Sequence, residues 1–143
     1  MAELEGRCMC GAVTVRATAG APILRACHCD MCRRWTSSMF MTVPTDPETI
    51  KVEGPVRTYC SSEWAERAFC ETCGSAIWYK TVDDQVRNLA AGLFDNAAGN
   101  TMKLEFYADR IPTGYALSGD HRRLSEAECL ELFAPKDEAG EQS

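Results

Sequence analysis

The stretches that decide the fold are Cys8-Met-Cys10, Cys27-His-Cys-Asp-Met-Cys32 and Cys70-Glu-Thr-Cys73, which hold seven of the nine cysteines. Thiolates separated by one or two residues are typical zinc ligands. The groups contain two, three and two cysteines, so the two pairs can form one closed four-sulfur site, while the trio leaves one coordination position free. Structural zinc sites are closed and catalytic ones keep an open position. The pattern therefore predicts one zinc ion that holds the fold and one that does chemistry.

The two pairs have spacings that suit a shared ion. Cys8 and Cys10 lie two residues apart, so on a strand both sulfurs face the same side. Cys70 and Cys73 have the spacing of a zinc knuckle, in which backbone N–H groups point at the sulfurs. A glycine follows each pair and permits the turn that the backbone needs there. We expect these four cysteines to bind the structural zinc and to tie the N-terminal strand to the middle of the chain.

The trio combines a strand-like gap with a knuckle-like gap. Its members, Cys27, Cys29 and Cys32, can cap one metal ion from one side and leave the other side open to water or a substrate thiol. One alternative is a second structural zinc completed by His28, Cys60 or another residue. Because His28 lies between two ligands on a presumed strand, we expect it to point away from the metal and to pack against the protein.

Three residues that follow the trio are candidates for ligand binding. Arg33 and Arg34 would offset the thiolate charge or hold a carboxylate of an anionic ligand, and Trp35 would form an apolar wall. The alternative for the two arginines is a solvated surface pair.

Composition excludes several classes of protein. The chain has 143 residues, a net charge of −6 and a pI near 4.9, which argues against nucleic-acid binding. No apolar run approaches the roughly 20 residues of a membrane span. The first residues lack the features of a signal peptide, so we expect a cytosolic protein with reduced thiols. A disulfide framework is the alternative, but the odd cysteine count and the Cys-x-Cys gap disfavour it.

The remaining sequence reads as short strands with little helical sequence between them, which favours a mainly β fold of twisted antiparallel sheets organised around zinc. The runs predicted as strands are 12–17, 23–27, 38–43, 56–60, 67–70, 75–80, 86–91 and 102–107. Short helices are predicted around 31–35 and over 125–133, the second with a capping box of Ser125 and Glu128. We expect one domain over 1–134 and a polar tail over 135–143. Cys60 and Cys129 have no partner at metal spacing and are expected to be buried free thiols.

Three segments carry a resemblance to a known family: 6–13 (GRCMCGAV), 27–34 (CHCDMCRR) and 69–75 (FCETCGS), with 91–95 (AGLFD) as a weaker fourth. The chain resembles the glutathione-dependent formaldehyde-activating enzymes, a family that includes centromere protein V. The resemblance implies a mainly β fold, a structural zinc on the two cysteine pairs and a catalytic zinc on the trio. Family members often carry a glycine a few residues after the two arginines, where this chain has Ser37 and Ser38.

The resemblance also implies an activity. The family's named enzyme joins glutathione and formaldehyde to S-hydroxymethylglutathione, formally a carbon–sulfur lyase reaction. We therefore expect a zinc-dependent lyase that uses glutathione or a similar thiol with formaldehyde or a related small aldehyde. The alternatives are a thiol-binding module without turnover and a structural two-zinc protein used in protein interactions.

Overall fold

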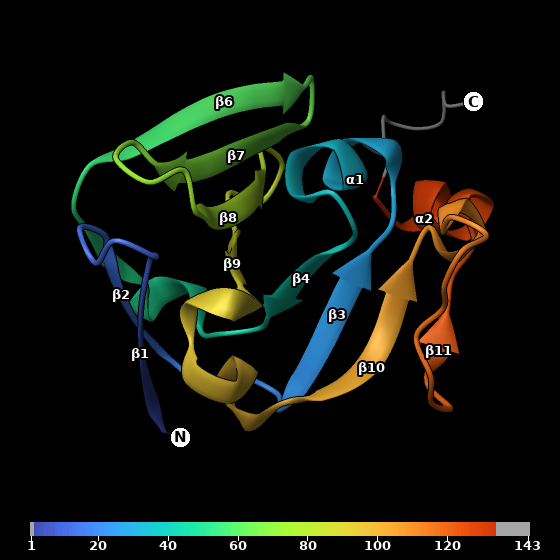
Figure 1. The fold of residues 1–143 in the computed structure, drawn as a ribbon, viewed down its shortest axis with the longest axis horizontal. Coiled ribbons are helices and arrows are strands. Elements are labelled where there is room, and N and C mark those ends of the chain that lie inside the picture. The colour runs from blue at the N-terminus through green and yellow to red at the C-terminus, as the bar shows by residue number, and fades with distance from the viewer. Residues whose placement is uncertain (1, 134–143) are drawn as a thin grey trace.

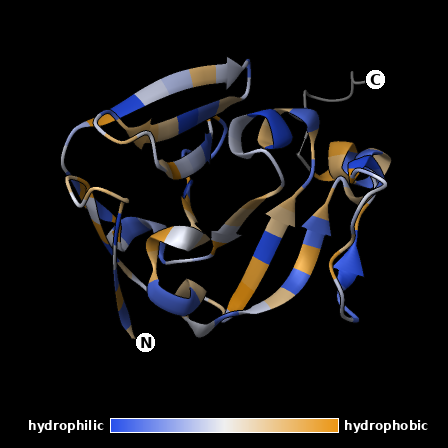
Figure 2. Ribbon diagram, viewed as in Figure 1, coloured by the Kyte–Doolittle hydropathy of each residue, from blue (hydrophilic) through white to orange (hydrophobic). Residues whose placement is uncertain are grey.

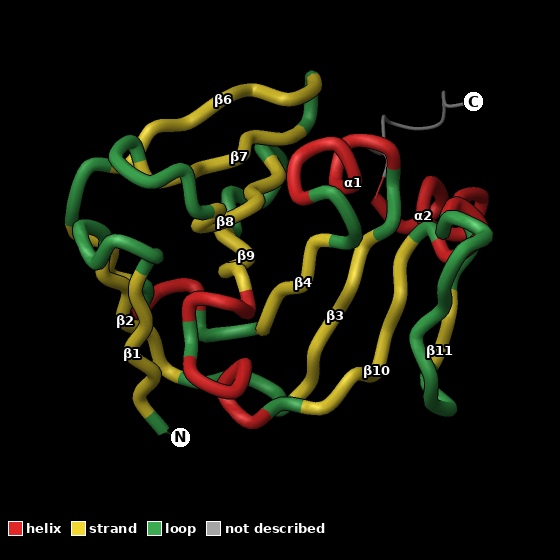
Figure 3. The backbone as a smooth tube through the Cα atoms, viewed as in Figure 1, coloured by secondary structure: helices red, strands yellow, loops and turns green. Residues whose placement is uncertain are grey.

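The computed structural model describes residues 2–133, and short strands are its main regular structure (Figures 1 and 3). The strands are β1 (Glu3–Arg7), β2 (Thr14–Thr18), β3 (Ile23–Cys27), β4 (Phe40–Val43), β5 (Lys51–Glu53), β6 (Val56–Ser62), β7 (Ala65–Cys70), β8 (Ala76–Thr81), β9 (Arg87–Ala90), β10 (Thr101–Phe106) and β11 (Arg122–Arg123). The α-helices are α1 (Asp30–Thr36) and α2 (Glu126–Phe133), and 3₁₀ turns are η1 (Pro47–Thr49), η2 (Ala91–Leu93), η3 (Asp95–Gly99) and η4 (Ala108–Arg110). The tail predicted at 135–143 lies outside the described residues.

Two sheets make up the fold. The smaller has the order β1-β2-β5, and the larger has the order β11-β10-β3-β4-β9-β8-β7-β6. The predicted mainly β fold with two short helices is confirmed. The expected antiparallel pairing holds for most neighbours and is wrong for β10, which runs parallel to β3 and to β11. Here η2 and η3 carry the chain from the end of β9 back to the start of β3, so β10 begins beside that start (Figure 1).

The hydrophobic core contains residues from both sheets. Along β2, Val15 and Ala17 are buried while Thr14 and Arg16 are exposed, the period-2 pattern of a strand with one face inside. From the larger sheet, β4, β8 and β9 contribute buried Val43, Ile77 and Leu89, among others. In the described range, no helix is long and apolar enough to cross a membrane.

Sequence analysis missed the strands β1 and β5. Both are short and rich in charge (ELEGR and KVE), because they form the two edges of the smaller sheet and bury little. Gly6 in β1 is informative, since a Cβ there would lie 2.6 Å from the carbonyl oxygen of Leu93. The close approach of β1 to η2 therefore requires glycine.

The helix predicted at 125–133 is confirmed with its capping box. The backbone N–H of Glu128 donates to the Ser125 hydroxyl at 3.2 Å, and the N–H of Ser125 donates to the Glu128 carboxylate at 2.8 Å. Cys129 is buried at this helix and accepts a hydrogen bond from the backbone N–H of Tyr107. The same prediction is wrong for Cys60, which is exposed because β6 is the edge strand of the larger sheet.

Candidate metal centres

The two cysteine pairs come together as predicted. The sulfurs of Cys8, Cys10, Cys70 and Cys73 all lie within 4.8 Å of one another. The Cys8–Cys10 sulfur distance is 3.7 Å and the Cys10–Cys70 distance is 3.9 Å. A tetrahedral zinc with bonds of about 2.3 Å places its sulfur ligands about 3.8 Å apart. The four-cysteine cluster therefore fits a closed zinc site.

Backbone N–H groups point at these sulfurs, as expected of zinc knuckles. The N–H of Val13 lies 3.2 Å from the Cys8 sulfur, and the N–H of Cys73 lies 3.4 Å from the Cys70 sulfur. The glycines after each pair, Gly11 and Gly74, have φ values of +84° and +83°. Both adopt the left-handed conformation that a side chain disfavours, so the sequence encodes the two turns that aim the donors.

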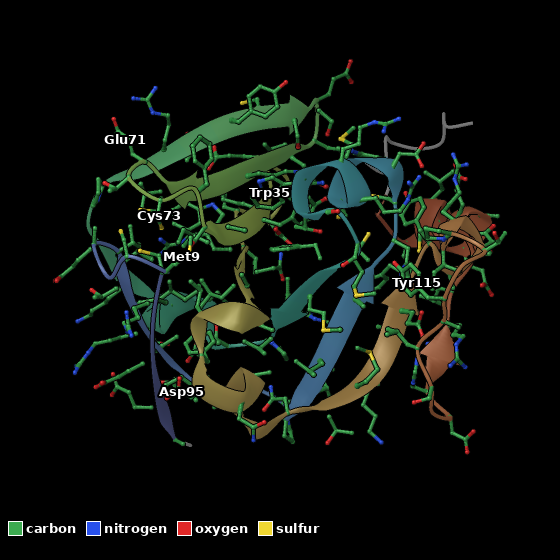
Figure 4. The ribbon with its side chains drawn as sticks, in the orientation of Figure 1. Met9, Trp35, Glu71, Cys73, Asp95 and Tyr115 are labelled. Carbon is green, nitrogen blue, oxygen red and sulfur yellow. The ribbon has the colours of Figure 1, made fainter. Side chains whose placement is uncertain are left out.

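Ser75 supports the four-cysteine cluster from outside. Its hydroxyl lies 3.2 Å from the Cys73 sulfur and accepts the backbone N–H of Met9 at 3.0 Å. Figure 4 shows Met9 and Cys73 next to each other. The Ser75 hydrogen bonds lower the pKa of Cys73 to about 5, which favours the thiolate that a metal needs.

The trio lies where β3 passes into α1. Cys27 ends the strand, Cys29 is the N-cap of the helix, and Cys32 lies in its first turn. The Cys29 sulfur accepts the backbone N–H of Cys32 at 3.4 Å, which is the capping interaction. The three sulfurs lie within 4.8 Å of one another. One strand end and one helix start therefore gather the three ligands, and Cys27 and Cys29 stay half-exposed.

Among the described residues, no fourth histidine, cysteine or carboxylate joins the trio. Cys60 lies on the edge strand β6, and His28 is turned elsewhere. Hydrogen bonds from Cys27 and Cys32 lower the pKa of Cys29 to about 2, and hydrogen bonding to Cys29 and Cys32 together with burial raises the pKa of Cys27. Cys29 is therefore the thiolate of the cluster, held by its two neighbours, and the three adjacent sulfurs form a ligand set that suits a soft or borderline cation.

His28 is fully buried and points away from the trio, as expected. Its Nε2 lies 2.7 Å from Oε1 of the buried Glu105 on β10. The other oxygen of Glu105 binds His121 and lies 3.2 Å from Nε of Arg123. Burial would raise the pKa of Glu105, but hydrogen bonds from His121 and His28 hold it below its ordinary value. This network fixes the loop between two trio ligands to β10 and to the segment around β11.

Sequence analysis missed Arg67, a buried cation in contact with the trio. It is buried on β7, and its Nη1 lies 3.6 Å from the Cys32 sulfur. Its guanidinium lies over the rings of Trp35 and Tyr79, at 5.0 and 4.9 Å from their centroids. Burial raises the pKa of Tyr79 to about 12, so that ring stays neutral. One feature of the sequence could have indicated this residue. Arg67 follows the apolar Ala65 by two positions, and residues two apart on a strand face the same side of the sheet.

The residues predicted to bind a ligand lie in different environments. Trp35, labelled in Figure 4, packs on Phe40 with ring centroids 4.9 Å apart, and its ring lies against the guanidinium of Arg67. Arg33 is paired with Asp30 and donates from Nε to the carbonyl of His28. Arg34 is exposed. Arg67 is therefore the residue whose positive charge lies beside the sulfurs of the trio. Ligand binding by Arg33 and Arg34 stays a prediction.

The segment after the two arginines, where family members often carry a glycine, contains a residue with a left-handed backbone conformation. Ser37 caps the C-terminus of α1 with φ 78° and ψ −9°, in the left-handed region. A side chain in this conformation costs roughly 1–2 kcal/mol relative to glycine. Ser37 therefore adopts a conformation that glycine would take at lower cost.

Together these features define a mainly β protein with two cysteine clusters that can each hold a metal ion, one closed and one open on one side. The sequence profile of the glutathione-dependent formaldehyde-activating enzymes matches residues 3–110, and the chain belongs to this family.

Two individual proteins are also similar. A protein of Schizosaccharomyces pombe, named an uncharacterized lyase, is 40% identical over 80 residues. That match spans 55% of this chain and 58% of the yeast protein, less than two thirds of the relative's length. A crystal structure of a Rhodobacter sphaeroides protein matches 70% of this chain and all of its own, with a TM-score of 0.54 and 20% identity. At that identity the likeness concerns the fold alone.

Proposed function

We propose that the protein is a zinc-dependent carbon–sulfur lyase that joins glutathione or a similar thiol to formaldehyde or a related small aldehyde. The observation that carries the proposal is the trio: three sulfurs gathered on one side, with no fourth ligand among the described residues. Family membership and the lyase name of the yeast relative support this class of reaction.

The reaction balances without a further reactant. The thiol sulfur forms a bond to the aldehyde carbon, and the electron pair of the carbonyl double bond moves to oxygen. That oxygen takes up the proton that the thiol releases. Zinc at the trio would supply a thiolate at neutral pH and polarise the aldehyde oxygen.

The chain's own residues prepare the site for a thiolate. Three thiolates on one zinc carry a net charge of about −1, so a fourth anionic sulfur is repelled. Arg67 lies 3.6 Å from the Cys32 sulfur and reduces this repulsion. The rings of Trp35 and Tyr79 hold the guanidinium in place and exclude water from its faces.

The test is the rate at which zinc-loaded protein interconverts glutathione, ¹³C-formaldehyde and the adduct, measured by exchange NMR against the spontaneous reaction. We expect acceleration by the wild type, loss of it in Cys29→Ser, and retention in Cys60→Ser, a matched change at an exposed cysteine outside both clusters. A spontaneous rate with the trio occupied by zinc would contradict the proposal. Thiol binding without turnover would then indicate a binding module, and no thiol binding would indicate a structural protein.

A further inference from the structure

Arg25 is the one charged residue of β3 (ILRAC), the hydrophilic band on that strand in Figure 2. It lies two residues before the trio ligand Cys27. Residues i and i+2 of a strand face the same side, so Arg25 projects from the sheet face that carries Cys27.

Contacts across the sheet confirm that this face is shared. Arg25 lies directly opposite Thr42 on β4, and its Nη2 donates to Oδ1 of Asn88 on β9 at 3.3 Å. Because β9 is two strand spacings from β3, the arginine side chain and Asn88 together bridge about 10 Å of sheet. Asn88 is held by its own amide group, which donates to the carbonyl of Tyr79 at 3.1 Å.

Paired residues on this face connect Asn88 with Arg67 beside the trio. Asn88 pairs with Tyr79 on β8, and Tyr79 pairs with Arg67 on β7. Arg67 contacts Cys32 at one side and Trp35 at the other. The face therefore carries Arg25 and the trio ligand Cys27 on β3, and Arg67, which contacts the trio ligand Cys32, on β7.

The charge of Arg25 is not balanced. Within residues 2–133, no carboxylate forms an ion pair with it, and its buried Nε has no hydrogen-bond partner. Burial lowers the pKa of the guanidinium, a sign of unfavourable desolvation. A half-buried, unpaired guanidinium is costly to keep and binds carboxylates with strong directional hydrogen bonds.

We infer that Arg25, positioned by Asn88, binds a carboxylate of the thiol whose sulfur occupies the open side of the trio. The inference rests on the proposed function and narrows its substrate to a thiol that also carries a carboxylate, because Arg25 lies two residues, about 7 Å of strand, from Cys27. Glutathione carries a carboxylate on each side of its central cysteine and meets this requirement, whereas small neutral thiols lack the second contact.

The test compares glutathione with its diethyl ester, in which both carboxylates are blocked, by isothermal titration calorimetry on zinc-loaded protein. The wild type should bind glutathione more tightly than the ester. Arg25→Gln should weaken glutathione binding roughly 10- to 100-fold, the loss of a charge-assisted hydrogen bond, and leave ester binding unchanged. Arg25→Lys should fall between them. Arg57→Gln is the control, because Arg57 is an exposed residue of β6 paired with Glu71.

The outcomes separate this inference from the proposed function. Equal binding of glutathione and ester by the wild type overturns the role of Arg25, as does an Arg25→Gln variant that keeps the preference for glutathione. Either result leaves the lyase proposal intact. If neither glutathione nor its ester binds the wild type, the result contradicts both the role of Arg25 and the lyase proposal. Zinc content and the thermal midpoint report whether Arg25→Gln is folded. If that variant is unfolded, the role of Arg25 is decided by the wild-type comparison of glutathione with its ester and by Arg25→Lys.

Discussion

The four-cysteine cluster and the trio use the same ligand atom in opposite ways. The first joins two segments about sixty residues apart and surrounds its centre with four sulfurs. The second takes all its ligands from six consecutive positions, 27–32, and leaves one side without a ligand in the described structure. A site that crosslinks distant segments stabilises the fold, whereas a local three-ligand site can lose its metal at little cost to folding. We therefore expect the four-cysteine cluster to be the structural site and the trio to be the chemical one.

The largest expected effect is that of Cys73→Ser. Removing one of four ligands opens the closed site and frees the link between the N-terminal strand and β7. Structural zinc contributes about 10–16 kcal/mol to the folding of small zinc domains, more than most domains have in reserve. We expect a largely unfolded protein, seen as a loss of amide dispersion in ¹H–¹⁵N NMR spectra. A folded Cys73→Ser protein with native dispersion would show that this cluster is not the structural one.

Cys29→Ser should act on metal content instead. The variant should keep its fold and bind one zinc ion fewer than the wild type, measured by elemental analysis on protein purified without chelator. Ser in place of Cys29 still caps α1, because a serine hydroxyl accepts the N–H that the sulfur accepts now. A Cys29→Ser chain that fails to fold would show that the trio is structural.

Arg67→Met tests the charge beside the trio. Methionine keeps part of the packing between Trp35 and Tyr79 and removes the guanidinium. Changes outside the ligands commonly cost 10- to 100-fold in metal affinity, and we expect that loss at the trio alone, by competition with a zinc chelator. Arg57→Met, on the exposed face of β6, is the control. Equal weakening of both clusters would mean that Arg67 acts through general stability.

The smallest expected effect is a change in folding stability at acidic pH, through Glu105. Hydrogen bonds from His121 and His28 depress the pKa of Glu105 in the folded state below 4.5, so the carboxylate stabilises the fold above that pH. This contribution is lost as the pH falls through the lower folded-state pKa. Glu105→Gln should therefore be less stable than the wild type near neutral pH, and the difference should shrink below about pH 4, measured by urea unfolding. A difference that does not change with pH would exclude the titration of Glu105.

Much of both clusters could be predicted from sequence because their ligands are encoded locally. Thiolate spacing and the glycines after each pair specify the turns around the metal, and Gly11 and Gly74 adopt the conformations that the spacing implies. The position of His28 also followed from strand alternation. These features depend on a few consecutive residues.

The features that sequence analysis missed depend on distant pairing. Arg67 meets the trio only because β7, β8 and β9 place it across the sheet from β3, and the partner of His28 is 77 residues away in β10. The parallel course of β10 results from the return through η2 and η3, and no local spacing rule specifies the direction in which that segment leads the chain. Nearby Arg33 and Arg34 were the natural candidates for the charge beside the trio, but the buried cation comes from another strand.

The most direct test of the central claim is native mass spectrometry of zinc-loaded protein with and without glutathione. One closed and one open site predict two zinc ions per chain and a complex that also carries one glutathione, with the glutathione absent from Cys29→Ser. Equal glutathione binding by the wild type and by Cys29→Ser, or a single zinc that Cys29→Ser retains, would contradict an open site at the trio.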